Sequence, residues 1–216
     1  MPSTQAAIFD FDGTIADSFD ELAEVYDQVA IDLGLRRLSR AEFESFRNMG
    51  SLEVMRAANV PLRKIPRLVS AMRAGMRERT KKLLPFDGIS DVLRSLQAQD
   101  CRCGILSSNS LENVQCFLRV HGLSMFDLFS CGTSFLGKAT RLRKINRQLA
   151  LPPKNIFYIG DEVRDVTAAN EVGIQSIGVC WGLASREALV AARATHIAER
   201  PEDLADLILS SRASLA

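Results

Sequence analysis

The amino-acid sequence predicts an α/β fold in which a doubly wound parallel sheet carries a small inserted α-helical domain. From residue 85 onward, short apolar runs alternate with amphipathic stretches of about 10 to 15 residues, which is typical of a parallel sheet covered by helices. An earlier apolar run, at residues 6–9, is followed by about 70 residues with helical periodicity alone. We therefore expect residues 1–15 and 85–216 to form the core and residues 16–84 the insertion. The 216 residues are sufficient for both.

Two capping signals organise the first helices of the insertion. Ser18 followed by Glu21, and Ser39 followed by Glu42, have the spacing of a capping box. In that motif the serine hydroxyl and the glutamate carboxylate accept hydrogen bonds from free amides at the start of a helix. The sequence therefore predicts one helix beginning after Ser18 and a shorter one beginning after Ser39.

The last helix of the insertion is predicted from a proline and an apolar stripe. Pro66 suits the first turn of a helix, and Val69, Met72 and Met76 follow at helical spacing. Because flexible methionine side chains commonly fill irregular gaps in cores, we interpret Met72 and Met76 as core residues.

The second part of the chain shows the alternation of strands and helices most clearly. The expected elements, in order, are a helix at 89–96, a strand at 102–106, a helix capped by Ser110, a strand at 128–131, a helix at 138–149, a strand at 156–159, a helix at 166–172, a strand at 174–179, a helix after Ser185, a strand at 195–197 and a helix from Pro201. Parallel strands joined by helices place their carboxyl ends at one edge of the sheet, where open α/β proteins bind ligands.

Composition limits the class of protein. Hydrophobic residues make up 47% and charged residues 25%, as is usual for a globular protein. No run of 18 apolar residues predicts a membrane span, and the segment before the first strand has no features of a secretion signal. The five cysteines include no Cys-x-x-Cys pair, which favours reduced thiols. We expect a cytoplasmic protein without a membrane partner.

Charge is unevenly distributed although the formal net charge is only +1. Residues 33–83 contain 13 Arg and Lys against four acidic residues. A basic segment near an acidic site favours an anionic substrate, whereas a solvated helix surface would explain the same charges. Only Phe43 and Phe46 supply aromatic rings in this segment, so the pattern does not indicate nucleic-acid binding.

The carboxyl end of the first strand carries the strongest chemical signal. Asp10 and Asp12 follow the apolar run 6–9, two residues apart, and project the same way. Two carboxylates held close together repel each other unless a cation or a shared proton lies between them. A hard divalent metal such as Mg²⁺ satisfies this need. A solvated Asp-Gly turn is the alternative reading of this stretch alone.

Polar residues also follow other expected strands and open other helices. Ser108 and Asn109 end the strand at 102–106, where a hydroxyl and an amide could bind an anion. Lys138 begins a helix, where the helix dipole disfavours a cation. An exposed lysine is the ordinary explanation, but this placement also hints at an anionic partner. Asp161 follows the most apolar strand, and Asp165 lies one helical turn later. Capping would explain one of these acids but hardly both.

Taken in order, these motifs resemble the haloacid dehalogenase-like phosphatase superfamily. The resemblance rests on Asp-Phe-Asp-Gly-Thr at 10–14, Ser108-Asn109, Lys138 and Gly-Asp-x-x-x-Asp at 160–165, and it extends over nearly the whole chain. It implies a Rossmann-like core and identifies residues 16–84 as a helical cap. Dehalogenases of this fold lack the second aspartate, so Asp12 favours a phosphatase.

The resemblance also implies roles for individual residues. Asp10 would be the nucleophile that forms an aspartyl-phosphate, and Asp12 would be the general acid and base. Mg²⁺ would be held by Asp10, the Asp12 backbone carbonyl and Asp161, with Asp165 supporting it directly or through water. The phosphoryl oxygens would be bound by Thr14, Ser108 and Lys138, with Asn109 as a helper. Relatives commonly have Lys-Pro where this chain has Lys138-Ala139, so Lys144 is the second candidate for the catalytic lysine.

The predicted function is a Mg²⁺-dependent phosphatase, similar to phosphoglycolate phosphatase, that hydrolyses a small anionic phosphorylated metabolite. Arg47, between two cap helices, is a candidate contact for a carboxylate or second phosphate of the substrate, and an exposed arginine at a helix C-terminus is the alternative interpretation. A phosphomutase resembling β-phosphoglucomutase would use the same catalytic residues and stays open. A non-catalytic phosphate-binding regulatory protein is a third reading, and the sequence leaves the oligomeric state undecided.

Overall fold

A six-stranded, wholly parallel sheet forms the centre of the molecule. The structure is a computed structural model that describes residues 5–46, 48–49, 51–132 and 137–210. The strand order is β5-β4-β1-β6-β7-β8. The strands are β1 (Ala6–Phe9), β4 (Arg102–Leu106), β5 (Phe126–Ser130), β6 (Ile156–Gly160), β7 (Gln175–Val179) and β8 (His196–Ala198). The predicted doubly wound α/β fold is therefore confirmed.

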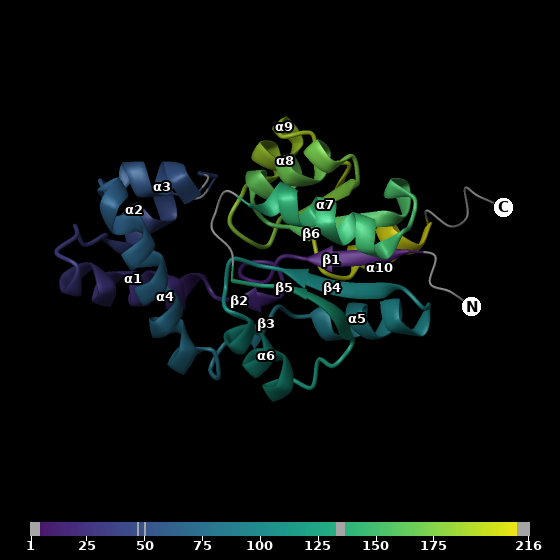
Figure 1. The fold of residues 1–216 in the computed structure, drawn as a ribbon, viewed down its shortest axis with the longest axis horizontal. Coiled ribbons are helices and arrows are strands. Elements are labelled where there is room, and N and C mark those ends of the chain that lie inside the picture. The colour runs from purple at the N-terminus through teal and green to yellow at the C-terminus, as the bar shows by residue number, and fades with distance from the viewer. Residues whose placement is uncertain (1–4, 47, 50, 133–136, 211–216) are drawn as a thin grey trace.

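Helices cover both faces of this sheet (Figure 1). One face carries α5 (Ile89–Ala98), α6 (Leu111–Val120) and α10 (Asp203–Leu209), and the other carries α7 (Lys138–Leu149), α8 (Val163–Val172) and α9 (Arg186–Ala191). Because both faces are covered, β1 and β6 are buried along their whole length.

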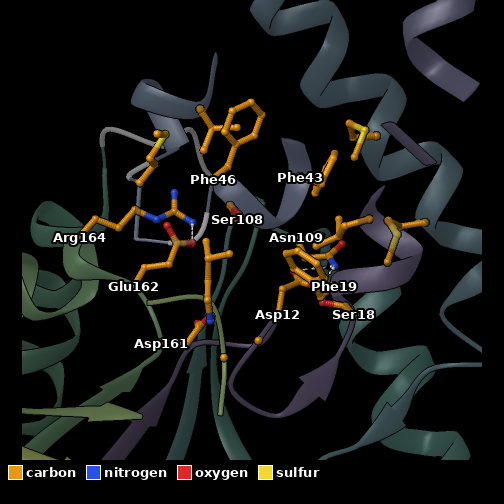
Figure 2. A pocket seen from close by; sticks show the side chains of 18 of the residues that line it. Asp12, Ser18, Phe19, Phe43, Phe46, Ser108, Asn109, Asp161, Glu162 and Arg164 are labelled. Carbon is orange, nitrogen blue, oxygen red and sulfur yellow. Dashed lines mark hydrogen bonds and ion pairs between the residues drawn. The ribbon is translucent and has the colours of Figure 1, made fainter. Parts of the chain in front are cut away.

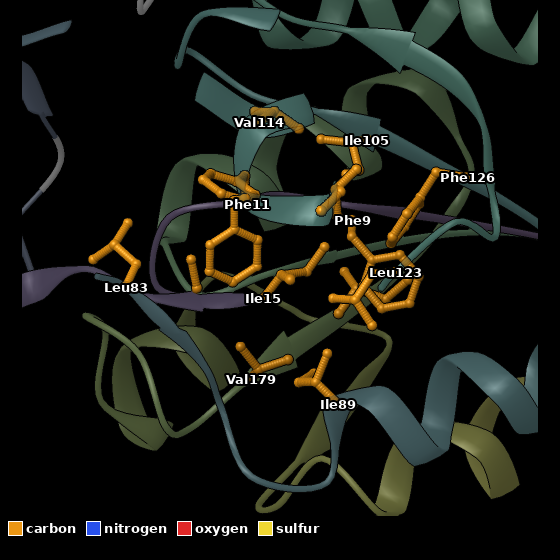
Figure 3. Packing of buried hydrophobic residues seen from close by; sticks show 14 of the residues in the cluster. Phe9, Phe11, Ile15, Leu83, Ile89, Ile105, Val114, Leu123, Phe126 and Val179 are labelled. Carbon is orange, nitrogen blue, oxygen red and sulfur yellow. The ribbon is translucent and has the colours of Figure 1, made fainter. Parts of the chain in front are cut away.

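The core on the α5 and α6 face is rich in aromatic side chains (Figure 3). Phe9 of β1 packs edge-to-face on Phe126 at a centroid distance of 6.1 Å, and Phe11 packs on Phe117 at 5.1 Å. Such edge-to-face pairs add to the stabilisation that comes from burial alone. Phe9 and Phe11 flank Asp10, so this packing fixes the backbone at the carboxyl end of β1.

The helices at residues 19–79 form a separate group beside the carboxyl edge of the sheet (Figure 1). They are α1 (Phe19–Asp32), α2 (Arg40–Ser45), α3 (Ser51–Ala57), the short 3-10 helix at Leu62–Lys64, and α4 (Ile65–Arg79). The chain enters and leaves this group through two antiparallel strands, β2 (Ala16–Asp17) and β3 (Leu84–Pro85). That pairing was not expected from the sequence. The division into domains at residues 16 and 84 stays a prediction.

The capping predictions had different outcomes. Ser39 and Glu42 form the expected reciprocal capping box at the start of α2, and Ser110 caps α6. The capping box at Ser18 was wrong, because in the described part of the chain its hydroxyl accepts no hydrogen bond from the first turn of α1. Strand β5 begins two residues earlier than expected, at Phe126. Within the described ranges no helix is long and apolar enough to cross a membrane.

Candidate active site

Three adjacent strands deliver the polar residues of the site to one edge of the sheet. The central strand β1 lies between β4 and β6, and Phe9 is in register with Ile105 on one side and Ile159 on the other. Asp10 continues this pairing by donating its amide hydrogen bond to the Ile159 carbonyl at 2.8 Å. Residues that directly follow the three strands therefore come close together, although they are far apart in the sequence.

Asp10 lies at the centre of this edge and is 4% exposed. Its Oδ1 accepts a hydrogen bond from the Phe11 amide at 2.8 Å, and its Oδ2 accepts one from Lys138 Nζ at 2.5 Å. Lys138 also donates to Asp165. The first residue of α7 thus places a buried cation between two carboxylates, which explains why a lysine occupies a helix start where the dipole disfavours it.

Asp161 follows β6 and is held from both sides. The Thr14 hydroxyl donates to its Oδ1 at 3.1 Å, and the Leu183 amide donates to its Oδ2 at 2.9 Å. The backbone at Gly13 passes so close that a Cβ there would lie 2.1 Å from Asp161 Oδ2. Gly13 also has a φ of +77°, a conformation that glycine adopts without strain. Glycine is therefore required here for two reasons.

Asp165, in the first turn of α8, completes the acidic cluster. Its side chain accepts hydrogen bonds from the Tyr158 hydroxyl at 3.0 Å and from the Glu162 amide at 3.1 Å. The bond from the Glu162 amide stabilises the start of α8. The Asp165 carboxylate therefore both caps this helix and belongs to the acidic cluster. A Cβ at Gly160 would lie 2.5 Å from Asp165 Cγ, which shows how closely the strand end approaches this side chain.

The three carboxylates suit a divalent cation. One oxygen each from Asp10, Asp161 and Asp165 lies within 4.8 Å of the others, and all three side chains are buried. Burial raises the pKa of Asp10 to about 7, against the opposing effect of Lys138, and burial together with Glu162 and Asp10 raises the pKa of Asp161 well above its usual range. Hard oxygen donors with this need for positive charge fit Mg²⁺.

Asp12 lies beside this cluster in a network of its own. The Asn109 side-chain amide donates to the two carboxylate oxygens of Asp12 at 3.1 and 3.4 Å. Asn109 Oδ1 in turn accepts from the Ser110 amide at 2.8 Å and from Asn113 at 3.0 Å. Burial raises the pKa of Asp12, so a proton is held there more readily than on an exposed aspartate. A carboxyl group with a raised pKa is suited to proton transfer.

A cavity of about 290 Å³ opens between this edge and the helices of the insertion. Asp12, Ser108, Asn109 and Asp161 line it on the sheet side, and Phe43 and Phe46 lie across from them (Figure 2). Asp10, Asp165 and Lys138 are buried and do not line the cavity themselves. Asp10 and Asp165 each place a carboxylate oxygen within 4.8 Å of one on Asp161, which does line it.

The structure brings most of the predicted site residues together. Ser108 lines the cavity, whereas Thr14 is fully buried with its hydroxyl directed to Asp161. Lys144, the second candidate for the catalytic lysine, is exposed on α7 and away from the cluster that Lys138 joins. Arg47 lies outside the described residues. The assigned roles of all these residues stay predictions.

Several residues around the site were not found from the sequence. The Glu162–Arg164 ion pair, with Oε1 and Nη2 2.5 Å apart, borders the cavity. Trp181, interpreted from the sequence as a packing residue that could also line the mouth of the site, lines the cavity and donates to the Thr14 carbonyl at 3.1 Å. Leu183 holds Asp161 through its backbone amide, which no side-chain pattern reveals. Glu162 and Arg164 lie inside the Gly-Asp-x-x-x-Asp motif, at positions where the motif allows any residue. The motif therefore drew attention to this stretch but not to these two side chains.

Comparisons with known proteins agree with this geometry. Residues 7–179 match the family described as haloacid dehalogenase-like hydrolase. A phosphoglycolate phosphatase from Synechococcus elongatus is 34% identical over 93% of this chain and 95% of its own. A pyrophosphatase from Listeria monocytogenes is 25% identical over 93% of this chain and 94% of its own. The crystal structure of a "predicted phosphatase" from Clostridium acetobutylicum superposes with a TM-score of 0.83 at 22% identity, covering 96% of this chain and 99% of its own.

The chain belongs to the haloacid dehalogenase-like hydrolase family. The resemblance stated from the motifs is thereby confirmed. Within this family the chain is an enzyme of the phosphatase type, as its relatives along nearly their whole length indicate.

Proposed function

We propose that the enzyme is a Mg²⁺-dependent phosphatase that hydrolyses a small phosphate monoester through an aspartyl-phosphate on Asp10. The observation that carries the proposal is the buried cluster of Asp10, Asp161 and Asp165 around Lys138, placed directly beside a cavity that Asp12 lines. One carboxylate in this arrangement is available as a nucleophile, and a second is available as an acid and base.

The first half of the proposed reaction transfers the phosphoryl group to the enzyme. A carboxylate oxygen of Asp10 forms a bond to phosphorus while the bond from phosphorus to the alcohol oxygen breaks. Asp12 gives its proton to the departing alcohol oxygen, so a neutral alcohol leaves. The amide of Asn109, 3.1 Å from Asp12, supports this role by orienting the carboxyl group. Ser108 is the proposed donor to a phosphoryl oxygen.

The second half returns Asp10 to its starting state. A water oxygen forms a bond to phosphorus, Asp12 accepts the proton from that water, and the bond between phosphorus and the Asp10 oxygen breaks. Inorganic phosphate leaves, and Asp12 is again protonated for the next cycle. Lys138 keeps its positive charge throughout and stabilises the negative charge that moves between the phosphoryl group and Asp10.

Asp10, Asp161 and Asp165, together with the Asp12 backbone carbonyl, are the proposed ligands for Mg²⁺. When bound, Mg²⁺ would supply positive charge to the phosphoryl oxygens and to the carboxylate cluster. The raised pKa values of Asp10 and Asp161 support this assignment, because they indicate that these buried carboxylates are short of positive charge.

The helices at residues 16–84 are proposed to act as a cap that selects the alcohol part of the substrate. Support comes from the cavity, which is lined both by residues of these helices and by residues of the sheet edge that carries Asp12 and Asp161. The five cysteines, all within the described residues, are free thiols, and this supports the proposed cytoplasmic location. The names of the relatives make 2-phosphoglycolate and pyrophosphate the first compounds to test.

The test is phosphate release from a panel of small phosphate esters, with Mg²⁺ or EDTA, for the wild type and for Asp10→Asn. We expect release that requires Mg²⁺ and is lost in Asp10→Asn. Asp91→Asn is the matched control, because Asp91 is an exposed aspartate on α5 that pairs only with Arg94 in the described region. Its activity should equal that of the wild type.

The same experiment addresses the two other readings. If a sugar phosphate gives an isomeric phosphate faster than free phosphate, the enzyme is a phosphomutase with the same nucleophile. If folded protein that binds Mg²⁺ acts on no ester, a non-catalytic role replaces the proposed one.

A further inference from the structure

The cavity beside the catalytic edge has a polar floor and an apolar roof. On the sheet side it is lined by carboxylate, amide and hydroxyl groups of Asp12, Asn109 and Ser108. On the other side Figure 2 shows Phe43 and Phe46 facing this floor from the helical insertion. A phosphoryl group at the floor would therefore direct its alcohol part toward the roof.

The roof is built from several elements of the insertion. Leu22 of α1, Phe43 and Phe46 at the end of α2, Val54 and Met55 of α3, and Met72 of α4 all line the cavity. Phe43 is held edge-to-face by Phe19 at 5.8 Å and by Tyr26 at 5.8 Å. These contacts give the roof a fixed aromatic centre rather than a set of loosely placed side chains.

Positive charge borders one part of the cavity. Two cationic side chains, Arg73 and Arg164, line the cavity within the described ranges. Arg164 forms an ion pair with Glu162, so together they add no net charge. Arg73 Nε donates to the Ser108 carbonyl at 2.9 Å. That carbonyl is uncharged, so Arg73 keeps its positive charge at one side of the cavity. The rest of the roof offers aromatic, aliphatic and thioether surface, which suits an apolar group.

We propose that the cavity binds an apolar alcohol part, so that the preferred substrates are phosphate monoesters of medium-length alkyl or single-ring aryl alcohols. This inference rests on the proposed phosphatase function and specifies its substrate class. Apolar pockets with a few polar groups at one end commonly orient ligands in this way. Each methylene group that moves from water to the roof should lower the free energy of the transition state relative to free enzyme and free ester. The value of kcat/KM should therefore rise with chain length.

A homologous series of alkyl phosphates tests the proposal. Methyl, butyl and hexyl phosphate have leaving alcohols of nearly equal acidity, so differences in kcat/KM report contacts of the chain with the cavity. We expect kcat/KM to rise about twofold to fourfold per methylene, the upper value being full burial. A flat series would overturn the proposal and leave the phosphatase function intact.

Binding gives a readout that does not depend on turnover. Trp181 is the sole tryptophan and lines the cavity, so its fluorescence reports the affinities of methylphosphonate and hexylphosphonate. We expect hexylphosphonate to bind at least tenfold more tightly. If this holds while no ester is hydrolysed, the proposed function fails and the apolar site stands. If the two phosphonates bind equally, the apolar site fails.

Met72→Gln makes the test specific to the roof, because it introduces an amide of similar size on α4. The increase in the logarithm of kcat/KM per methylene should fall to less than half of its wild-type value in this variant. Ile31→Gln is the matched control: Ile31 is 60% exposed on α1 and does not line the cavity. Its alkyl series should match that of the wild type. An unchanged series in Met72→Gln would show that the chain does not enter this cavity.

Discussion

Lys138 Nζ lies 2.5 Å from Asp10 Oδ2, and both side chains are buried. Lys138 also donates to Asp165, so one ammonium group serves two carboxylates. Burial lowers the pKa of Lys138, but Asp10 and Asp165 raise it above its ordinary value, and the side chain stays charged. The acidic cluster is therefore partly neutralised by the protein itself.

Lys138→Met should destabilise the metal-free protein by about 3 kcal/mol, because it leaves buried carboxylates without their cation. It should also lower kcat for phosphate release by about 100-fold or more. Urea unfolding in EDTA and steady-state phosphate release measure the two effects.

Lys144→Met is the control for the loss of a lysine from the same helix. Lys144 is exposed, so the free energy of unfolding should change by no more than about 0.5 kcal/mol and activity should persist. Equal effects of the two substitutions would contradict the assignment of Lys138.

Gly13→Ala should lower the free energy of unfolding more than Gly173→Ala does, although both glycines have the same φ. At Gly13 and Gly173 φ is +77°, so alanine pays about 1 kcal/mol of left-handed strain at either position. At Gly13 the new Cβ would also lie 2.1 Å from Asp161 Oδ2, whereas at Gly173 nothing lies within 4 Å. We expect Gly13→Ala to cost about 2 kcal/mol more in urea unfolding. Equal costs would mean that Asp161 moves aside freely.

Mg²⁺ should stabilise the folded protein through Asp161. A ligand that binds the folded state alone at about 100 times its Kd adds about 2.7 kcal/mol of stability. Thermal unfolding should therefore shift upward with Mg²⁺ in the wild type and in Asp206→Asn, which changes an exposed residue of α10. Asp161→Asn should show little shift. A full shift in that variant would place the cation elsewhere.

Thiol reactivity should depend on pH in a defined direction. Burial raises the pKa of Cys131 to about 11, and burial together with Glu199 raises the pKa of Cys180 to about 11. At pH 8 only about one thiol in a thousand is then a thiolate, the reactive form. Alkylation by iodoacetamide should be at least about 100-fold slower than in urea, and it should accelerate about tenfold per pH unit up to pH 10. Mass spectrometry of peptides measures the rates; equal rates in folded and unfolded protein would contradict the shifts.

The fold and the acidic cluster were accessible from the sequence because both rest on local patterns. Apolar runs located β1, β4 and β6, and the aspartates that follow two of them share one sheet edge by the geometry of parallel strands. The antiparallel pairing of β2 with β3 was not accessible, because each strand has only two residues.

The character of the cavity could not be read from the sequence. Met72 and Met76 have the spacing of an ordinary core face, and Met76 is indeed buried, yet both also line the cavity. Helical periodicity identifies an apolar face but does not distinguish a face packed on protein from one that borders a ligand site. The hydrogen bond from Thr14 to Asp161 likewise depends on a contact between residues 147 positions apart.

Chemical trapping of the phosphoryl group on Asp10 tests the account most directly. The enzyme is mixed with Mg²⁺ and its best ester, quenched during turnover and treated with borohydride, which reduces an acyl phosphate to an alcohol. We predict that peptide mass spectrometry finds homoserine at Asp10, only when ester and Mg²⁺ are both present. Phosphate release without any reduction of Asp10, or reduction at a different carboxylate, would contradict the proposal that Asp10 is the nucleophile.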